Sequence, residues 1–292
     1  MNNSQRSAPV VHGFAGYANG HSALQGSTWR LFQNLDRLFL SWANYWDAAE
    51  YQFPATLPAH ELNKIGYFKS FPQHLTLPVC LDADHDNLAE FAAGDPLDAQ
   101  GALRLGKCAP VKEVLTPAAC YHFYVNFQDQ VLDAPRYVTT RATCFRRESH
   151  YTPLRRQWSF NMREIVCIGT ADEVTRFLYM QRSVVEEFFM GIGLPITWQG
   201  ATDAFFNPAA NPKYLAQKLD PVKTEMVYGP DIAIGSVNFH RNYFGEAFHI
   251  ARAGEDAYSG CVAFGLERWV HAFLAHFGPD EKNWPALPGG RA

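Results

Sequence analysis

The feature that most constrains the fold is the stretch of residues 139–169, where polar and apolar residues alternate with a period of two. Successive side chains of a strand point to opposite faces of a sheet, so the alternation predicts two strands. Arg146 and Glu148 share one face of the first strand. One face of the second strand carries Arg156, Trp158, Phe160, Met162 and Glu164. A turn around residues 151–153 pairs the strands, so that their charged and aromatic faces meet.

Helical spacing precedes this predicted hairpin. A long amphipathic helix is expected from Ser27 to about Tyr51, with a Ser/Thr cap at its start. Its apolar positions are Leu31, Leu35, Leu38, Trp42 and Tyr45. Pro54 and Pro58 break the helix, and a second capped helix is expected near His60.

Two more helices are predicted after the hairpin. Residues 170–190 begin with Thr170 followed by Glu173 at the third helical position, which is the pattern of a capping box. Near the C-terminus a strand of small residues changes into a helix with apolar residues at helical spacing. Gly278-Pro279 then ends that helix.

Composition and charge limit the class of protein. With 292 residues, 47% of them hydrophobic, the chain can bury the core of one large domain or of two modest ones. The formal net charge of −4 excludes a general attraction to nucleic-acid phosphates or anionic lipid. No run of about 18 apolar residues occurs and the start lacks an export-signal pattern, so we expect a cytoplasmic protein without membrane contact.

The two ends of the chain and its cysteines give little sign of further structure. The polar start, residues 1–25, and the tail, residues 286–292, are expected to be flexible, which leaves residues 26–285 as the folded domain. The six cysteines form no CxxC pair and no short regular spacing. This pattern argues against a disulfide framework and a zinc ribbon, so most of the thiols are expected to be reduced and buried.

Three segments resemble the sequence motifs of class II aminoacyl-tRNA synthetases. Phe-Arg-x-Glu at residues 145–148, followed by Arg-x-x-x-Phe-x-x-x-Glu from Arg156 to Glu164, resembles motif 2. The Gly-Leu-Glu-Arg sequence at residues 265–268 resembles motif 3, and the helix and strand over residues 27–54 resemble motif 1.

Within this superfamily the sequence most resembles the amino acid:[carrier protein] ligases, short homologues of the atypical, zinc-dependent seryl-tRNA synthetases. The stretches FPATLPAHELNKIGYFKSFP and CVAFGLERW carry the resemblance. It implies an α+β fold with a largely antiparallel sheet flanked by helices. It also implies a homodimer formed through the motif 1 region.

The resemblance implies an ATP site made of arginines. Attack of a carboxylate on the α-phosphorus of ATP builds up negative charge that fixed cations must offset. The resemblance gives Arg146 the α-phosphate and the carboxylate, and it gives Arg156 and Arg268 the γ-phosphate. It places Glu148 at the adenine edge and Phe160 against the adenine face. Without the resemblance, we would interpret Arg146 and Arg268 as members of surface ion pairs, and Phe160 as a core residue.

The resemblance also implies a zinc ion held by Cys120, Glu164 and Cys261, with Cys120 at the start of a strand-like segment. Three protein ligands leave a tetrahedral zinc ion one open position, which would take the substrate α-amino group. The wide spacing of these residues shows no metal site by itself, because buried free cysteine is common. Cys144 and Cys167 are interpreted as core cysteines.

A segment near residue 240 is expected to line the amino-acid pocket. His240 and Arg241 lie where class II enzymes place a strand that reads the amino acid and ATP, so Ser236 and Asn238 are predicted to bind substrate. The acidic residue that holds magnesium on that strand is not evident. Of the two nearest alternatives, Glu225 and Asp231, the sequence favours neither.

The implied activity is ATP-dependent formation of a glycyl or alanyl adenylate and transfer to the phosphopantetheine thiol of a carrier protein. Residues 211–226 are expected to form a docking insert in which Lys213, Lys218 and Lys223 attract an acidic carrier, or else a solvated surface segment. With about 25 residues before the first helix, no tRNA is expected as acceptor. The alternatives are a seryl-type tRNA synthetase lacking its own tRNA-binding domain and a catalytically silent, nucleotide-binding regulatory paralogue.

Overall fold

A seven-stranded sheet forms the centre of the computed structural model, which describes residues 13–18 and 20–288. The strands, in their order across the sheet, are β3 (Ala49–Tyr51), β7 (Arg136–Phe145), β8 (Ser159–Gly169), β14 (Tyr258–Gly265), β11 (Ile232–Arg241), β10 (Lys223–Tyr228) and β9 (Ile196–Ala201). Within this sheet, only β3 and β7 pair in parallel. The prediction of an α+β fold with a largely antiparallel sheet is therefore confirmed.

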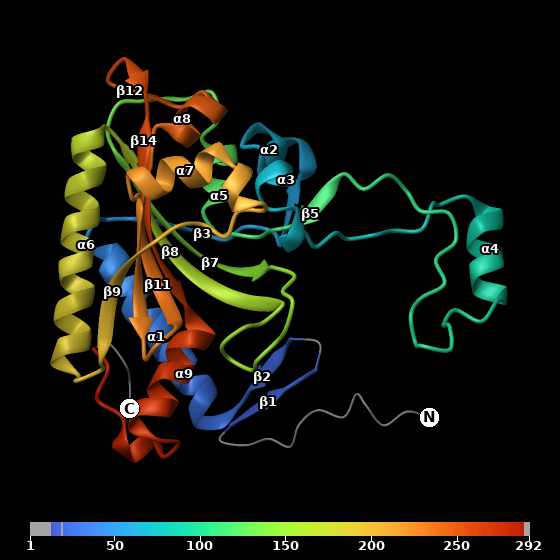
Figure 1. The fold of residues 1–292 in the computed structure, drawn as a ribbon, viewed down its shortest axis with the longest axis horizontal. Coiled ribbons are helices and arrows are strands. Elements are labelled where there is room, and N and C mark those ends of the chain that lie inside the picture. The colour runs from blue at the N-terminus through green and yellow to red at the C-terminus, as the bar shows by residue number, and fades with distance from the viewer. Residues whose placement is uncertain (1–12, 19, 289–292) are drawn as a thin grey trace.

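Three helices cover one face of this sheet (Figure 1). They are α1 (Gly26–Asn44), α6 (Ala171–Gly191) and α9 (Leu266–Phe277). Phe39 of α1 stacks on Phe264 of β14 with ring centroids 4.2 Å apart, and Trp269 of α9 packs against both rings. Among the described residues, no helix is long and apolar enough to cross a bilayer.

The structure corrects the predicted limits of the first helix. Helix α1 ends at Asn44, and residues 49–51 form strand β3 where the pattern predicted helix. The predicted Ser/Thr cap is also wrong, because Gln25 is the N-cap and makes no side-chain capping bond. A helix does begin near His60, at Ala59, but its N-cap is Pro58 and makes no side-chain capping bond. The capping box between Thr170 and Glu173 at the start of α6 is confirmed.

Shorter helices cover the opposite face (Figure 1). Residues of these helices and of the sheet line a cavity between them. They are α2 (Ala59–Lys64), α3 (Tyr67–Ser70), α5 (Tyr121–Asn126), α7 (Pro212–Leu219) and α8 (Tyr243–Phe248). Small sheets join β4 (Thr56–Pro58) with β5 (Glu113–Leu115), and β6 (Val131–Leu132) with β12 (Ala251–Arg252) and β13 (Glu255–Asp256). Cys120 caps α5, so the predicted strand there is wrong. Phe123 and Tyr124 have a preference for strands, but both side chains are fully buried in the helical conformation, and this burial outweighs the preference.

The N-terminal segment, predicted to be flexible up to residue 25, is ordered where the structure describes it. Strands β1 (Phe14–Gly16) and β2 (Ser22–Leu24) form a hairpin against the loop that joins β7 to β8. Trp158 of that loop donates its backbone N–H to Gly20 and stacks on His21. Residues 1–12 lie outside the described residues, as do residues 289–292 of the predicted tail.

Residues 77–111 form an arm that projects from the body and carries α4 (His85–Ala93) at its far end, a feature that no sequence pattern predicted (Figure 1). No residue of α4 is buried, and the arm exposes several apolar side chains, including Leu97, Leu103 and Leu105. The arm holds six acidic and two basic residues, a net charge of −4. This equals the formal charge of the whole chain.

Candidate active site

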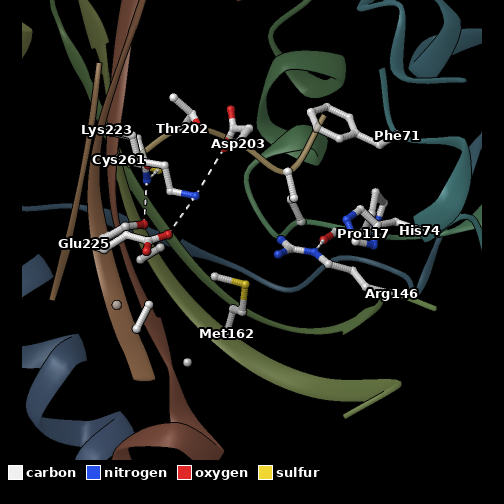
Figure 2. A pocket seen from close by; sticks show the side chains of 18 of the residues that line it. Phe71, His74, Pro117, Arg146, Met162, Thr202, Asp203, Lys223, Glu225 and Cys261 are labelled. Atoms are coloured by element: carbon white, nitrogen blue, oxygen red, sulfur yellow. Dashed lines mark hydrogen bonds and ion pairs between the residues drawn. The ribbon is translucent and has the colours of Figure 1, made fainter. Parts of the chain in front are cut away.

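A cavity of about 900 Å³ lies between the sheet and the short helices. Strands β8, β11 and β14 form one wall, and α3, α5 and the β7–β8 loop contribute to the others. Cavities that hold substrates the size of a nucleotide fall in this range of volume. Figure 2 shows Arg146 on one side of the cavity, with Glu225, Lys223 and Cys261 across from it.

Arg146 sits one residue beyond the end of β7, where its backbone still bonds to the partner segment. Its N–H donates to the Trp158 carbonyl at 3.0 Å, and its Nε donates to the Pro117 carbonyl at 2.8 Å. The prediction that Arg146 and Glu148 share a strand face is therefore wrong, since β7 ends at Phe145. The side chain is nevertheless held in the cavity wall by these bonds.

Arg268 follows the start of α9 and is fixed by two backbone carbonyls. Its Nε donates to Arg155 at 2.7 Å and its Nη1 to Ala233 at 2.8 Å. Burial lowers the pKa of Arg268, and the neighbouring positive charges of Arg146 and Arg156 lower it further. A guanidinium group whose charge is destabilised by burial and by two neighbouring cations favours an anionic ligand beside it.

The surface ion pair considered for Arg146 and Arg268 is absent. Over the part of the chain that the structure describes, neither side chain pairs with a carboxylate. Arg156 differs, because its Nη1 lies 2.8 Å from Oε2 of Glu148. Two unpaired guanidinium groups and one paired group therefore face the same cavity.

Phe160 lies on β8 beside these arginines. The guanidinium of Arg146 lies over its ring, 5.3 Å from the centroid, while Cys144 and Met162 pack around it. Phe160 is therefore both a cavity-lining residue and part of a small core cluster. Its predicted contact with adenine stays a prediction.

Cys120, Glu164 and Cys261 come together from α5, β8 and β14. All three are buried, and one potential ligand atom from each lies within 4.8 Å of the others. Oε1 of Glu164 accepts the Ala119 N–H at 3.2 Å, while Oε2 is buried without a hydrogen-bond partner among the described residues. Two thiols and an unsatisfied carboxylate oxygen are a donor set that suits zinc.

Burial and a hydrogen bond between the two thiols shift the pKa values of this trio. Desolvation raises the pKa of Glu164 to about 8. A hydrogen bond between the thiols raises the pKa of Cys120 and lowers that of Cys261. Cys144 and Cys167 are buried in separate core clusters outside the trio, which confirms their interpretation as core cysteines.

Strand β11 lines the cavity next to the trio. Ser236, Asn238 and His240 all face it, and Asn238 donates its side-chain N–H to Ser236 Oγ at 2.9 Å and to Cys261 Sγ at 3.3 Å. Arg241 lies at the rim, ion-paired with Asp220. The sequence placed these residues near the amino-acid pocket but did not predict the contact with the cysteine.

The sequence patterns did not predict a half-buried ion-pair cluster centred on β10. Lys223 Nζ lies 3.2 Å from Asp203 Oδ1 and 3.1 Å from Glu225 Oε1 (Figure 2). The prediction that Lys223 belongs to a docking insert is therefore wrong, because it lies in the central sheet. The alternation of Lys223, Glu225 and Val227 with their neighbours was the available signal.

Both magnesium alternatives line the cavity, and neither carboxylate is unpaired. Glu225 contacts Lys223, and Asp231 lies 3.3 Å from Arg155 near the surface. Glu148 and Glu225 are close enough to Arg268 to offset part of the lowering of its pKa.

Known proteins share this arrangement of fold and motifs. A family model described as tRNA synthetase class II core domain (G, H, P, S and T) matches residues 111–277. Amino acid--[acyl-carrier-protein] ligase 1 of Bradyrhizobium diazoefficiens is 35% identical over 244 residues, covering 80% of this chain and 73% of that protein. The chain belongs to the amino acid:[carrier protein] ligase family. The resemblance inferred from the motifs is thus confirmed, and the family is one of ligases.

More distant relatives link this ligase family to seryl-tRNA synthetases. Type-2 serine--tRNA ligase of Methanococcus aeolicus is 25% identical over 256 residues, covering 80% of this chain and 48% of that protein. The fold matches M. kandleri SerRS, solved in complex with A. aeolicus tRNASec, with a TM-score of 0.77 and 20% identity. That match covers 92% of this chain and 56% of the other, so the chain spans about half the length of these relatives.

Proposed function

We propose that the protein activates a small amino acid with ATP and transfers it to the phosphopantetheine thiol of a carrier protein. The observation that carries the proposal is that unpaired Arg146 and Arg268 and the Cys120–Glu164–Cys261 trio line one cavity. Anion-binding groups at one end and metal-binding groups at the other fit the two substrates of an activation reaction. Names of the 35% and 33% identical relatives support carrier-protein aminoacylation.

In the first step the substrate carboxylate attacks the α-phosphorus of ATP, and pyrophosphate leaves with the electrons of the broken P–O bond. Arg146 would contact the carboxylate and the α-phosphate, because its side chain is fixed by the Pro117 carbonyl. Arg268 and Arg156 would neutralise the departing phosphates. Magnesium with ATP would supply further positive charge, with Glu225 as the nearby carboxylate.

The trio would hold a zinc ion that orients the amino acid. When bound, zinc supplies one open coordination position, which a neutral α-amino group can occupy. Cys120 and Cys261 would contribute thiolates, and Glu164 would contribute the oxygen that lacks a protein partner. Glycine or alanine is the proposed amino acid because of the resemblance of the sequence to this ligase family.

In the second step the carrier thiolate attacks the acyl carbon, and AMP leaves as the thioester forms. Helix α7 is the proposed docking element, in place of the whole segment 211–226. Its Leu215 and Leu219 are exposed one turn apart with Lys218 beside them. Lys213 is engaged elsewhere, since its Nζ donates to Tyr243 and to the Ile65 carbonyl. An apolar pair with one adjacent lysine suits an acidic carrier helix.

Pyrophosphate exchange with each of the twenty amino acids tests activation, and metal analysis of the same sample tests zinc. We expect exchange with glycine or alanine and about one zinc per chain. Transfer is then compared between phosphopantetheinylated carrier protein and total tRNA. Charging of tRNA instead would indicate a seryl-type synthetase, and no exchange with any amino acid would indicate a silent regulatory paralogue.

We also propose a homodimer formed through α1 and β3, the region that corresponds to motif 1. Light scattering of the purified protein tests this state, and the expected mass is twice 32.9 kDa. A mass that stays at one chain across a dilution series would contradict the dimer.

A further inference from the structure

We infer that Asn238 and His240 are positioning residues for Cys261, each directing an N–H group at its sulfur. The inference rests on the proposed metal site and adds the residues that would orient one of its ligands. Asn238 Nδ2 lies 3.3 Å from Cys261 Sγ, and His240 Nε2 lies 3.7 Å from the same sulfur. Both distances are within the range for hydrogen bonds to sulfur, which is a larger acceptor than oxygen.

The sheet places both donors by register. Asn238 of β11 is the direct antiparallel partner of Cys261 on β14. His240 lies two residues further along β11, so its side chain emerges on the same face. A register shift between Phe239 and Arg241 bends the strand at this point and turns the imidazole toward the sulfur.

Hydroxyl groups on the other side of the imidazole favour one tautomer of His240. Nδ1 lies 3.0 Å from Tyr124 Oη and 3.2 Å from Ser259 Oγ, and the two hydroxyls are 3.1 Å apart. A hydroxyl can donate to Nδ1, which leaves the proton on Nε2, facing the sulfur. With the proton on Nδ1 instead, the Nε2 lone pair would face the lone pairs of a metal-bound thiolate.

Aromatic rings keep the imidazole in this orientation. Phe244 meets the His240 ring edge-on at 5.0 Å and stacks on Tyr124 at 4.0 Å. Tyr124 is fully buried, so its hydroxyl has little freedom to leave the histidine. Phe244 and Tyr124, which pack in the core, therefore hold the imidazole of His240, and that imidazole contacts the proposed metal ligand Cys261.

His240 lies next to the trio but is not one of its potential metal ligands. Among the described residues, the donor atoms that lie within 4.8 Å of one another come from Cys120, Glu164 and Cys261 only. The imidazole thus contacts one ligand and leaves the fourth position for the substrate amine. Groups that hydrogen-bond to a metal ligand orient it and tune the metal, and their loss typically lowers metal affinity about 10-fold to 100-fold.

The test measures zinc affinity by chelator competition and the sulfur-to-cobalt charge-transfer band of the cobalt-loaded protein. Asn238→Leu and His240→Phe remove the N–H donors while keeping side-chain bulk. We expect each to weaken zinc binding about 10-fold to 100-fold and to shift the band. His240→Gln keeps an N–H donor and should recover part of the affinity. Phe239→Leu, on the opposite face of β11, is the matched control.

Three outcomes separate the possibilities. Zinc affinity and cobalt spectra unchanged in both variants would overturn the inference and leave the metal site standing. A wild-type protein that binds neither zinc nor cobalt would overturn the metal site and this inference together. A cobalt spectrum that does not respond to glycine in the wild type, but does in His240→Phe, would make His240 a fourth ligand and overturn the positioning role.

Discussion

Arg163 and Asp36 form a two-pronged, buried ion pair behind the strand that carries Glu164. Arg163 Nε lies 2.8 Å from Asp36 Oδ1, and Nη2 lies 3.1 Å from Oδ2. Glu50 of β3 accepts from the remaining nitrogen, Nη1, at 2.7 Å. Alternation on β8 directs Arg163 to the helix-covered face and Glu164 to the cavity, so this pair joins α1 and β3 to the strand that holds a proposed metal ligand.

Asp36→Ala should destabilise the fold strongly. It removes both Asp36 oxygens from a guanidinium that is 2% exposed and leaves Glu50 as its carboxylate partner, so we expect a loss toward the lower end of the about 3–5 kcal/mol that breaking a buried ion pair costs. Denaturant unfolding gives the free energy of unfolding for comparison. Arg37→Ala, on the exposed side of the same helix, should change it by less than about 0.5 kcal/mol. Equal losses in the two variants would contradict a structural role for the pair.

Arg146→Ala should slow adenylate formation severely while the fold stays intact. Loss of a fixed cation at the reacting phosphate typically lowers the rate about 100-fold to 1,000-fold. Amino-acid-dependent pyrophosphate exchange measures the effect, and circular dichroism checks the fold. Arg147→Ala is the control, because that neighbouring side chain is exposed. Full exchange activity in Arg146→Ala would refute the assigned role.

Cys261→Ala should lower the bound zinc and weaken amino-acid affinity. The variant removes one of the two sulfur donors of the trio, and no other cysteine lies within ligating distance in the described part of the chain. Metal analysis and the KM for the amino acid are the measurements. Cys80→Ala, exposed on the arm, is the control. Unchanged metal content in Cys261→Ala would move the zinc site elsewhere.

The metal-free protein should lose stability as pH rises. The pKa of Glu164 is raised by burial to about 8, from 4.5, so its carboxyl group is protonated in the metal-free fold at neutral pH. Its contribution to stability is complete below the unfolded pKa near 4.5 and is lost as pH rises to about 8. The loss is on the order of 4 kcal/mol.

Denaturant unfolding with a chelator, from about pH 5 to about pH 8, measures this dependence. Glu164→Gln keeps a neutral side chain of the same shape at every pH, so its unfolding free energy should fall less over the same interval. Identical pH dependence in the two proteins would show that Glu164 does not ionise on unfolding as described. Added zinc should stabilise the wild type more at the upper end of the interval, because the bound ligands are deprotonated.

Gly16→Ala should raise the KM for ATP. A Cβ at Gly16 would lie 2.4 Å from Cγ of Pro153, in the loop that carries Arg155 and Arg156, so the loop must shift. We expect about a tenfold increase, or roughly 1.4 kcal/mol, with the amino-acid KM unchanged. Gly191→Ala, where a Cβ meets nothing within 4 Å, is the control. An unchanged KM for ATP would show that the hairpin does not position the loop.

Strands and helix ends were predicted correctly where one strong local pattern was present in the sequence. The period-two alternation predicted the β7–β8 pairing, although β8 begins at Ser159, so that Arg156 and Trp158 lie in the loop and not on the strand as predicted. The capping box predicted the start of α6. Cys120, Glu164 and Cys261 were brought together only by family resemblance. Their spacing along the chain carries no geometric information, because the sheet and α5 bring them together through long-range packing.

Predictions were wrong or missing where contacts between distant segments outweigh the local conformational preference of the residues. The aromatic run after Cys120 reads as a strand, yet burial against α8 makes it a helix. The ion pairs of Arg163 and Lys223 could not be predicted, because a single charged residue in a strand pattern does not reveal its partner. Asp36 and Asp203 are distant in sequence, so only the fold shows that these charges are paired.

The acidic arm has a consequence for how an acceptor arrives. Since residues 77–111 account for the entire charge imbalance, the remainder of the protein is formally neutral. A negatively charged acceptor would therefore be repelled from the side of the molecule on which the arm projects and would meet no such barrier near Lys218. Repulsion at a distance would select the direction of approach before any contact forms.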